Sequence, residues 1–300
     1  MLGFLNLHKP EGLTSHDCVA KVRRILQVKR VGHGGTLDPA ATGVLPIAAG
    51  RATRLLQFLP DAKVYRARVR FGIQTNTDDL EGEVLAMQPL PELSLQQVLP
   101  LLERFSGAIE QVPPQFSAIQ CGGKRLYELA RAGEVADVPS RTVVVSRIDV
   151  LKWHPGDFPE LELEIACGPG TYIRAIARDL GAALGIGGTL AQLVRTQSCG
   201  LCLQDSLTLD ELAARVERQT LGLLAPDAAI GHLPAVTFPA GTSKRWCQGQ
   251  HIPLEVAISP PNIAAETPVR VYNMSGMFLG VAIVQIPGDR AIVSPKVVLV

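Results

Sequence analysis

Alternation of apolar and polar residues predicts strands at several places along the chain. Between residues 63 and 71, four apolar side chains from Tyr65 to Phe71 alternate with three arginines, so one face of this strand is expected to be buried and the other solvated. Similar runs predict further strands, over residues 2–8, 141–151, 161–167 and 189–196.

Apolar residues at helical spacing predict helices between these strands. One such stripe runs from Val19 to Leu26, and Ser15 is the expected N-cap of that helix. Thr208 and Glu211 form a capping box, which predicts a helix that ends near Arg218. Three more helices are predicted, starting at Arg51, after Ser94 and near Thr171.

The pattern changes towards the end of the chain. Helical periodicity fades, and a proline-rich stretch over 253–268 precedes short strands with turn sequences at 273–276 and 287–289. The chain is therefore expected to have an α+β fold. A mixed β-sheet with flanking helices is predicted for residues 1–233, and a small β-rich domain for residues 234–300.

Composition limits the kind of protein. Of the 300 residues, 47% are hydrophobic and 19% are charged, which is typical of a soluble globular protein with a sizeable core. No apolar run is long enough to cross a membrane, and the N-terminus lacks a signal-peptide pattern, so a cytoplasmic location is expected. Cys199 and Cys202 form a C-x-x-C pair without further ligands at zinc spacing, which favours ordinary thiols.

Charge is distributed unevenly, although the net charge is only +1. Residues 1–70 carry twelve Lys or Arg against four Asp or Glu, whereas residues 71–113 carry one Arg against seven acidic residues. A basic N-terminal part can attract a polyanion such as nucleic acid. Composition alone nevertheless favours ordinary solvated surface charge.

A glycine-rich loop over residues 32–39 holds the candidate chemistry. Its three glycines allow tight turns and Pro39 constrains the exit from Asp38, so the loop can present a carboxylate at a surface. The loop is not a phosphate-binding P-loop, because no Gly-Lys-Ser/Thr follows, and the chain has no G-x-S-x-G nucleophile elbow. From these residues alone, Asp38 is either a catalytic carboxylate or a turn residue that caps a nearby backbone group.

The stretch over residues 32–46, GHGGTLDPAATGVLP, resembles the catalytic motif of the TruB family of tRNA pseudouridine synthases, which more usually has Thr in place of Gly34. Other segments resemble family motifs in the expected order: Lys9-Pro10-x-Gly12-x-Thr14-Ser15, Tyr65-Arg66, Thr75-Asn76-Thr77-Asp78-Asp79 (with Asn76 in place of an Asp), Gly170-Thr171-Tyr172-Ile173-Arg174 and Leu193-Val194-Arg195-Thr196. The resemblance covers essentially the whole chain. The terminal region resembles a PUA domain, an RNA-binding fold, through less specific motifs.

The resemblance implies an isomerase and names its catalytic residues. Enzymes of this family break the bond between uridine N1 and the ribose, turn the base and rejoin it through C5. Because no redox change or net hydrolysis occurs, neither a cofactor nor a metal is expected, and a carboxylate suffices as nucleophile or base. The resemblance assigns this role to Asp38, with Arg174 as its charge partner and Tyr65 stacked on the target base.

Five further residues are implied to contact or support the substrate. His33 matches a histidine that enters the RNA loop when the target nucleotide is flipped out. Leu193 matches an apolar residue of the family's cleft, and Tyr172 matches a residue that contacts the substrate. Asp79 fits the family motif that the 75–79 segment resembles. Lys9 is expected either to support the site or to contact phosphate.

The resemblance also implies the partners. The expected substrate is U55 in the T-loop of tRNA, and the enzyme is expected to act as a monomer without a guide RNA or a protein partner. Residues 111–140 correspond to a family insertion that closes over the RNA, with candidate phosphate contacts at Lys124, Arg125 and Arg131.

Two alternatives remain open. An RNA-guided synthase of the dyskerin type shares the central motifs, but such relatives often carry lysine-rich tails, whereas this chain ends in the apolar residues 297–300. A non-catalytic RNA chaperone is the other, and the intact set of Asp38, Tyr65 and Arg174 argues against it.

Overall fold

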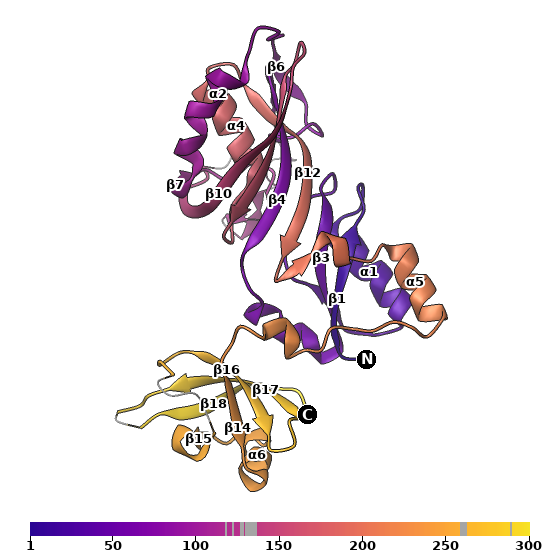
Figure 1. Ribbon diagram of the computed structural model, residues 1–300, viewed down its shortest axis with the longest axis vertical. Coiled ribbons are helices and arrows are strands. Elements are labelled where there is room, and N and C mark those ends of the chain that lie inside the picture. The colour runs from indigo at the N-terminus through magenta and orange to yellow at the C-terminus, as the bar shows by residue number, and fades with distance from the viewer. Residues whose placement is uncertain (118, 122, 127–128, 130–136, 259–262, 289) are drawn as a thin grey trace.

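The computed structural model describes the chain except for residues 118, 122, 127–128, 130–136, 259–262 and 289, and gives only the backbone of residues 121, 124 and 125. Its large sheet is built from residues before 203, and a smaller β-rich domain, drawn in orange and yellow, lies at one end of the elongated molecule (Figure 1). In the described part of the chain, no helix is long and apolar enough to cross a membrane.

The large sheet is mixed, which confirms the predicted α+β class. Its strands are β1 (Gly3–Lys9), β2 (Val31–His33), β3 (Thr42–Ala49), β4 (Lys63–Phe71), β7 (Gly107–Gln111), β10 (Arg141–His154), β11 (Glu160–Cys167), β12 (Gly188–Ser198) and β13 (Leu201–Cys202). Within the described residues their order is β1-β3-β12-β4-β11-β10-β7, with β2 beside β3 and β13 beside β12. Every strand predicted from alternation is present, with ends shifted by a few residues at most.

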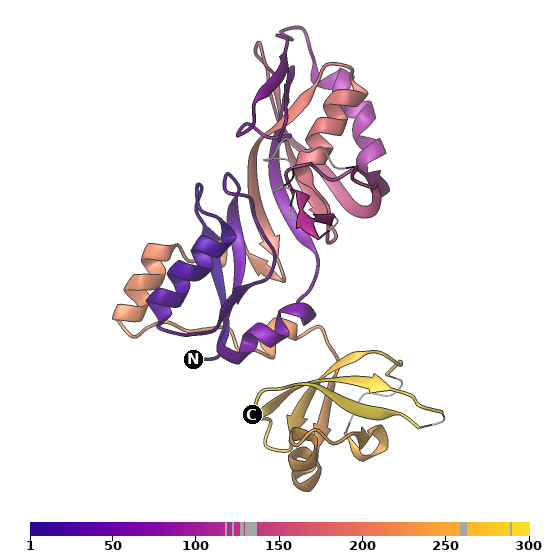
Figure 2. The same cartoon turned by 180° about the vertical axis from the view of Figure 1, so that it is seen from behind.

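Helices α2 (Leu95–Leu102) and α4 (Ile173–Ala183) lie together on one face of this sheet (Figures 1 and 2). The apolar side chains of β4 pack there in one cluster with apolar residues of both helices. The opposite face carries the arginines of β4, which form cross-strand ion pairs with Glu160 and Glu162 of β11. The alternation in β4 therefore separates a buried face from a charged face, as predicted.

Helices α1 (Ser15–Leu26) and α5 (Leu209–Glu217) cover the other half of the sheet, against β1 and β3. The capping box of α5 is confirmed. The predicted N-cap of α1 is wrong, because Thr14 takes that position. Asp17 lies at N3 relative to Thr14 and closes a capping box with it, which leaves the Ser15 hydroxyl free for another contact.

The remaining elements of the large part are short. The helix expected from Arg51 is a 3-10 helix, η1 (Gly50–Phe58), and α2 ends earlier than predicted because a 3-10 turn replaces its last residues. The others are β5 (Ile73–Thr75), β6 (Val84–Met87), η2 (Glu103–Phe105), β8 (Gln120–Cys121), β9 (Lys124–Arg125), η3 (Leu203–Asp205) and η4 (Ala228–Ile230).

The terminal domain is built on a second sheet. Its elements are β14 (Ala235–Phe238), α6 (Ala240–Cys247), β15 (Ile252–Pro253), η5 (Leu254–Val256), β16 (Pro268–Asn273), β17 (Phe278–Gln285) and β18 (Ile292–Val298). Among the residues described, the strand order is β14-β16-β17-β18-β15. Helix α6 was not expected, because its one large apolar residue, Trp246, gives no visible periodicity, although that side chain fills the core of the domain.

The two parts meet at η1. Arg51 and Arg54 each donate a hydrogen bond of 2.8 Å, to the carbonyl oxygens of Leu299 and Val298 respectively. Apolar side chains of η1, including Leu55, share one buried cluster with apolar side chains of β17 and β18. The terminal domain is thus attached through the segment that directly follows β3.

Strand β12 joins two halves of the large sheet. It pairs antiparallel with β4 over its whole length, but parallel with β3 only at Val194 and Arg195. Before Val194, in the part of the chain that the structure describes, β12 is not paired with β3. The candidate active site lies between the two strands there.

Candidate active site

The loop between β2 and β3 carries Asp38, and the backbone requires glycine once in this loop and once at the start of β3. Gly35 has a φ of 121° and Gly43 a φ of 106°, both in the region that favours glycine. A Cβ atom at Gly43 would also lie 2.3 Å from the carbonyl oxygen of Arg195. The start of β3 therefore lies directly against β12.

Gly34, where the family motif more usually has Thr, faces a thiol. The Cys199 Sγ lies 3.5 Å from the Gly34 carbonyl oxygen, and a Cβ atom at Gly34 would meet the Leu59 side chain at 3.1 Å. Cys199 and Cys202 are both free cysteines, at the turn between β12 and β13. Among the described residues, no group of three or more His, Cys, Asp or Glu side chains is arranged to hold a metal ion.

Lys9 and Ser15 fix the middle of the loop. Lys9 has no exposed surface, and its ammonium donates to the carbonyl oxygens of Pro10, Pro39 and Ala41 at 2.6–2.9 Å. Burial lowers the pKa of this ammonium. The Ser15 hydroxyl bonds both the amide and the carbonyl of Leu37. Of the two roles expected for Lys9, this geometry favours support of the site.

Arg195 holds both ends of the loop. Its guanidinium is completely buried and donates to the carbonyl oxygens of Gly35 (3.0 Å) and Thr36 (3.3 Å), which precede Asp38, and of Val44 (2.7 Å), which follows it.

Asp38 meets Arg174 across the opening between β3 and β12. The Arg174 Nη2 lies 3.0 Å from the Asp38 Oδ2, and the side chains of Arg174 and Asp38 are 6% and 42% exposed. Arg174 lies in the first turn of α4 and also donates to the carbonyl oxygens of Thr77 and Phe116, at 2.8 and 2.9 Å. A carboxylate that faces the solvent is thus held by a guanidinium that is itself fixed from behind.

A second carboxylate, Asp79, lies on the other side of Arg174. Its Oδ2 lies 3.5 Å from the Arg174 Nη1, and its Oδ1 accepts hydrogen bonds from the Thr77 hydroxyl and the Glu81 amide. The preceding residue, Asp78, adopts a φ of 62° and pairs with Arg178 at 2.9 Å. This turn therefore brings Asp79 to the same guanidinium as Asp38.

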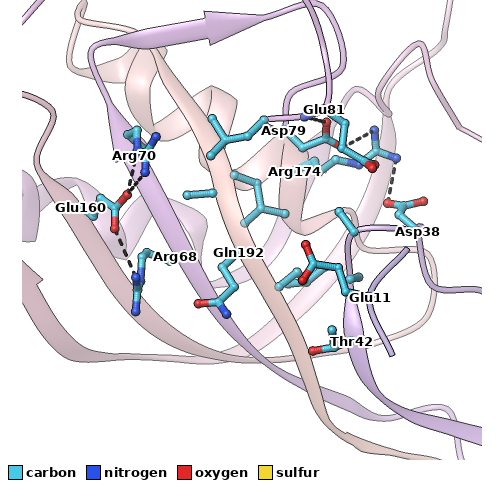
Figure 3. A pocket seen from close by; sticks show the side chains of 16 residues that line it. Glu11, Asp38, Thr42, Arg68, Arg70, Asp79, Glu81, Glu160, Arg174 and Gln192 are labelled. Carbon is cyan, nitrogen blue, oxygen red and sulfur yellow. Dashed lines mark hydrogen bonds and ion pairs between the residues drawn. The ribbon is translucent and has the colours of Figure 1, made fainter. Parts of the chain in front are cut away.

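An open cavity of about 500 Å³ lies against these groups. Figure 3 shows Asp38, Arg174 and Asp79 on one side of the cavity and Arg68 and Arg70 on the other, with β12 passing between the two groups. Leu193 lines the cavity from β12, as its predicted cleft position requires. The structure therefore brings together four of the predicted residues: Asp38, Arg174, Asp79 and Leu193.

Tyr65 lies beside this group but not in the cavity lining. Its side chain belongs to the same apolar cluster as Leu37 and Ala41 of the loop, and the residue is 7% exposed. Burial raises the pKa of the Tyr65 hydroxyl, and the neighbouring Arg195 guanidinium opposes that rise. Tyr65 is therefore a core tyrosine next to the site in this structure.

His33 and Tyr172 lie outside the cavity lining. The half-buried His33 ring packs edge-on against His16, with 5.4 Å between ring centroids, and burial lowers its pKa. Tyr172 caps α4, its backbone exchanges two hydrogen bonds with the Gln111 side chain, and the Arg141 guanidinium lies over its ring at 4.9 Å. His33 ends β2, and Tyr172 lies directly before α4.

The predicted phosphate contacts of the insertion receive little structural description. Lys124 and Arg125 form β9, of which the backbone alone is described, and Arg131 lies outside the described residues.

Two residues near Asp38 were missed by sequence reasoning. Arg195 belongs to the segment Leu193-Val194-Arg195-Thr196, which resembles a family motif. The sequence around a single arginine in an apolar strand does not indicate which groups it will bond. Glu81 lines the cavity, and burial together with the Asp79 and Asp38 carboxylates raises its pKa. Its position two residues after Asp79 was the available signal.

Comparison with known proteins identifies the family. Residues 23–173 match the model of the TruB family pseudouridylate synthase N-terminal domain, and residues 234–299 match the C-terminal domain model of pseudouridine synthase II TruB. The chain is 58% identical to tRNA pseudouridine synthase B of Gloeothece citriformis, over 100% of this chain and 97% of that protein. The chain belongs to the TruB family of pseudouridine synthases. It is therefore an isomerase.

A second relative supports the same family, and solved structures share the fold. Identity to tRNA pseudouridine synthase B of Trichormus variabilis is 57%, over 95% of each chain. Among solved structures, an H/ACA RNP bound to a substrate RNA containing 2'-deoxyuridine shares the fold, with a TM-score of 0.74 and 23% identity over 99% of this chain and 85% of that one. The archaeal box H/ACA sRNP Nop10-Cbf5 complex gives a TM-score of 0.71 at 25% identity, over 98% and 85% of the two chains.

Proposed function

We propose that this TruB-family enzyme converts U55 in the T-loop of tRNA to pseudouridine, with Asp38 as nucleophile and without a guide RNA, a cofactor or a protein partner. The names of its relatives support tRNA as substrate. The observation that carries the proposal is the ion pair between the half-exposed Asp38 and the buried Arg174 at an open cavity.

The chemistry asks little beyond a positioned carboxylate. The bond from the ribose C1′ to N1 breaks, a bond from C1′ to C5 forms, C5 loses its proton and N1 gains one, so atoms and electrons balance within the nucleotide. Arg174 directs the Asp38 carboxylate, and the residues that bond the loop hold it still. A fixed nucleophile at a bound substrate lowers the entropic part of the barrier.

The place of Asp38 in the cavity supports base flipping as part of this proposal. A uridine that is stacked in the T-loop cannot place its C1′ and C5 against a carboxylate in a cavity between β3 and β12, so the nucleotide must leave the stack. A cavity of about 500 Å³ falls in the range usual for small-molecule sites. His33, at the mouth of the loop, is the residue that we expect to fill the vacated stack.

The flanking residues receive supporting roles in this proposal. Leu193 forms an apolar wall for the base, and Tyr172 contacts the substrate from the start of α4. Tyr65 stacks on the base, which requires a shift of the apolar residues that cover its ring. The 234–300 domain contributes RNA affinity as a PUA-like module, and residues 111–140 close over the RNA.

A guided reaction is the second candidate, because both structural neighbours come from H/ACA particles. One experiment separates the two. Purified protein is incubated with an unmodified tRNA transcript alone, and pseudouridine is mapped along the product. We expect pseudouridine at position 55 with wild-type protein and none with Asp38→Asn. Absence of product without added particle components would refute unguided action, and product at another site would refute the assignment to U55.

A further inference from the structure

Arg195 is a buried cation that faces backbone oxygens instead of a carboxylate. Among the described residues no ion pair involves it, and its side chain has no exposed surface. Burial of an unpaired charge is costly, and neutral side chains could satisfy the same carbonyl groups. A guanidinium at this place therefore calls for a reason beyond filling the core.

The bonds of Arg195 close the base of the catalytic loop. One side of the guanidinium donates to Val44, where β3 begins to pair, and the other side donates to Gly35 and Thr36, where the loop leaves β2. The planar fork spans both ends at once, because its donors point in fixed and different directions. Asp38 lies between these two ends, so its position depends on the distance at which Arg195 holds them.

The same side chain lies against Tyr65. Arg195 and Tyr65 are directly paired residues of β12 and β4, so their side chains share one face of the sheet. Leu193, two residues earlier on β12, points to that same face and reaches the cavity. One guanidinium thus contacts the loop of Asp38 and adjoins the aromatic ring beside it.

We propose that Arg195 is a positioning residue that sets Asp38 relative to Tyr65, and so sets the nucleophile relative to the base that stacks on the ring. The proposal rests on the proposed function of Asp38 and Tyr65. Lysine cannot replace Arg195 in this role, because the three donors of an ammonium diverge from one atom and cannot bridge the two ends of the loop. Lys9, by contrast, bonds the carbonyl oxygens of Pro10, Pro39 and Ala41 through one nitrogen atom, whereas the three acceptors of Arg195 are each bonded by a different nitrogen.

The test compares Arg195→Lys and Arg195→Met with the matched variant Thr196→Val. Thr196 is the next residue of β12, and its hydroxyl bonds Val64 of β4 instead of the loop. Three quantities are measured on the full-length protein: the single-turnover rate at saturating T-arm RNA, the Kd for that RNA, and amide hydrogen exchange in residues 34–44 and 235–298.

For Arg195→Lys we expect the single-turnover rate to fall about 100-fold, because small misplacement of reacting groups has effects of that size. The Kd should stay within about threefold, since Arg195 is buried and lies outside the RNA surface. Exchange should rise in residues 34–44 and stay unchanged in 235–298, whereas Thr196→Val should leave the rate and the loop exchange as in wild type.

Three results would overturn the proposal: a rate within threefold of wild type in folded Arg195→Lys, a rate loss without faster exchange in 34–44, or the same loss in Thr196→Val. If Arg195→Met fails to fold, the lysine variant still decides. If wild-type protein makes no pseudouridine, the proposed function fails, and unchanged loop exchange in Arg195→Lys would then separately refute the clamp.

Discussion

Arg174→Lys is the sharpest test of the ion pair at the cavity. The arginine contacts two carboxylates and two carbonyl oxygens, of Asp38, Asp79, Thr77 and Phe116. A lysine ammonium keeps the positive charge but cannot reach both sides of this group. We expect it to keep the contacts on one side and to lose both the carboxylate contact and the carbonyl contact on the opposite side.

The size of the effect follows from the lost contacts. A hydrogen bond to a neutral acceptor contributes about 1 kcal/mol and one to a charged group about 2 kcal/mol, so the loss of one of each costs about 3 kcal/mol. If that loss is felt in the transition state, the rate falls about 100-fold, since each 1.4 kcal/mol is about tenfold. RNA affinity should change little, because the Arg174 side chain is 6% exposed.

The assay is single-turnover release of tritium from C5-labelled uridine in a T-arm RNA, with enzyme in excess over its Kd. Tritium leaves C5 when the new bond to C1′ is complete. Arg178→Lys is the control, because it makes the same change one turn later on α4, where the partners are Asp78 and Asp179. A wild-type rate for Arg174→Lys, or a deficit that disappears at saturating RNA, would refute the role given to the ion pair.

Three other predictions test the site. Asp38→Asn should abolish pseudouridine formation with RNA binding preserved, as measured by product mapping and filter binding; normal product would disprove the nucleophile assignment. Because the proposed reaction needs only a positioned carboxylate, excess chelator should leave the rate unchanged, and strong inhibition that added metal reverses would contradict this. His33 has a pKa below 6.5 in the folded state, so below pH 6.5 the unfolded chain binds more protons and stability is lost as pH falls. His33→Gln should flatten that acid loss in denaturant titrations between pH 7 and pH 5, whereas the exposed His232→Gln should leave it; equal slopes in wild type and His33→Gln would show that His33 does not contribute.

The strands could be predicted because their period is carried by the residues themselves. In β4 every second side chain is apolar, and the two faces separate a helix-covered core from a row of ion pairs. Helix caps were less certain. Ser15 and Thr14 are both good N-caps, and the choice depends on Asp17 and on the contact that Ser15 makes with Leu37 of a distant loop.

The site could be predicted only where a motif marked it. Asp38 and Asp79 come from two separate segments and both contact the guanidinium of Arg174, which comes from a third. No local sequence pattern contains this arrangement. For Tyr65 the local pattern predicts the structural environment but indicates no role in catalysis. Its period marks it as core, and in the structure it is core, so its proposed role as base platform rests on the family resemblance.

The hydrogen bonds of Arg195 have a consequence for the stage of synthesis at which the site can form. The loop that holds Asp38 is synthesised well before the residue that donates its three guanidinium bonds, which lies more than 150 positions later. Contacts between such distant residues form late, after most of the chain is present. A nascent chain that ends between residues 174 and 195 therefore already contains Asp38, Tyr65 and Arg174, but lacks the side chain that we propose sets them in register.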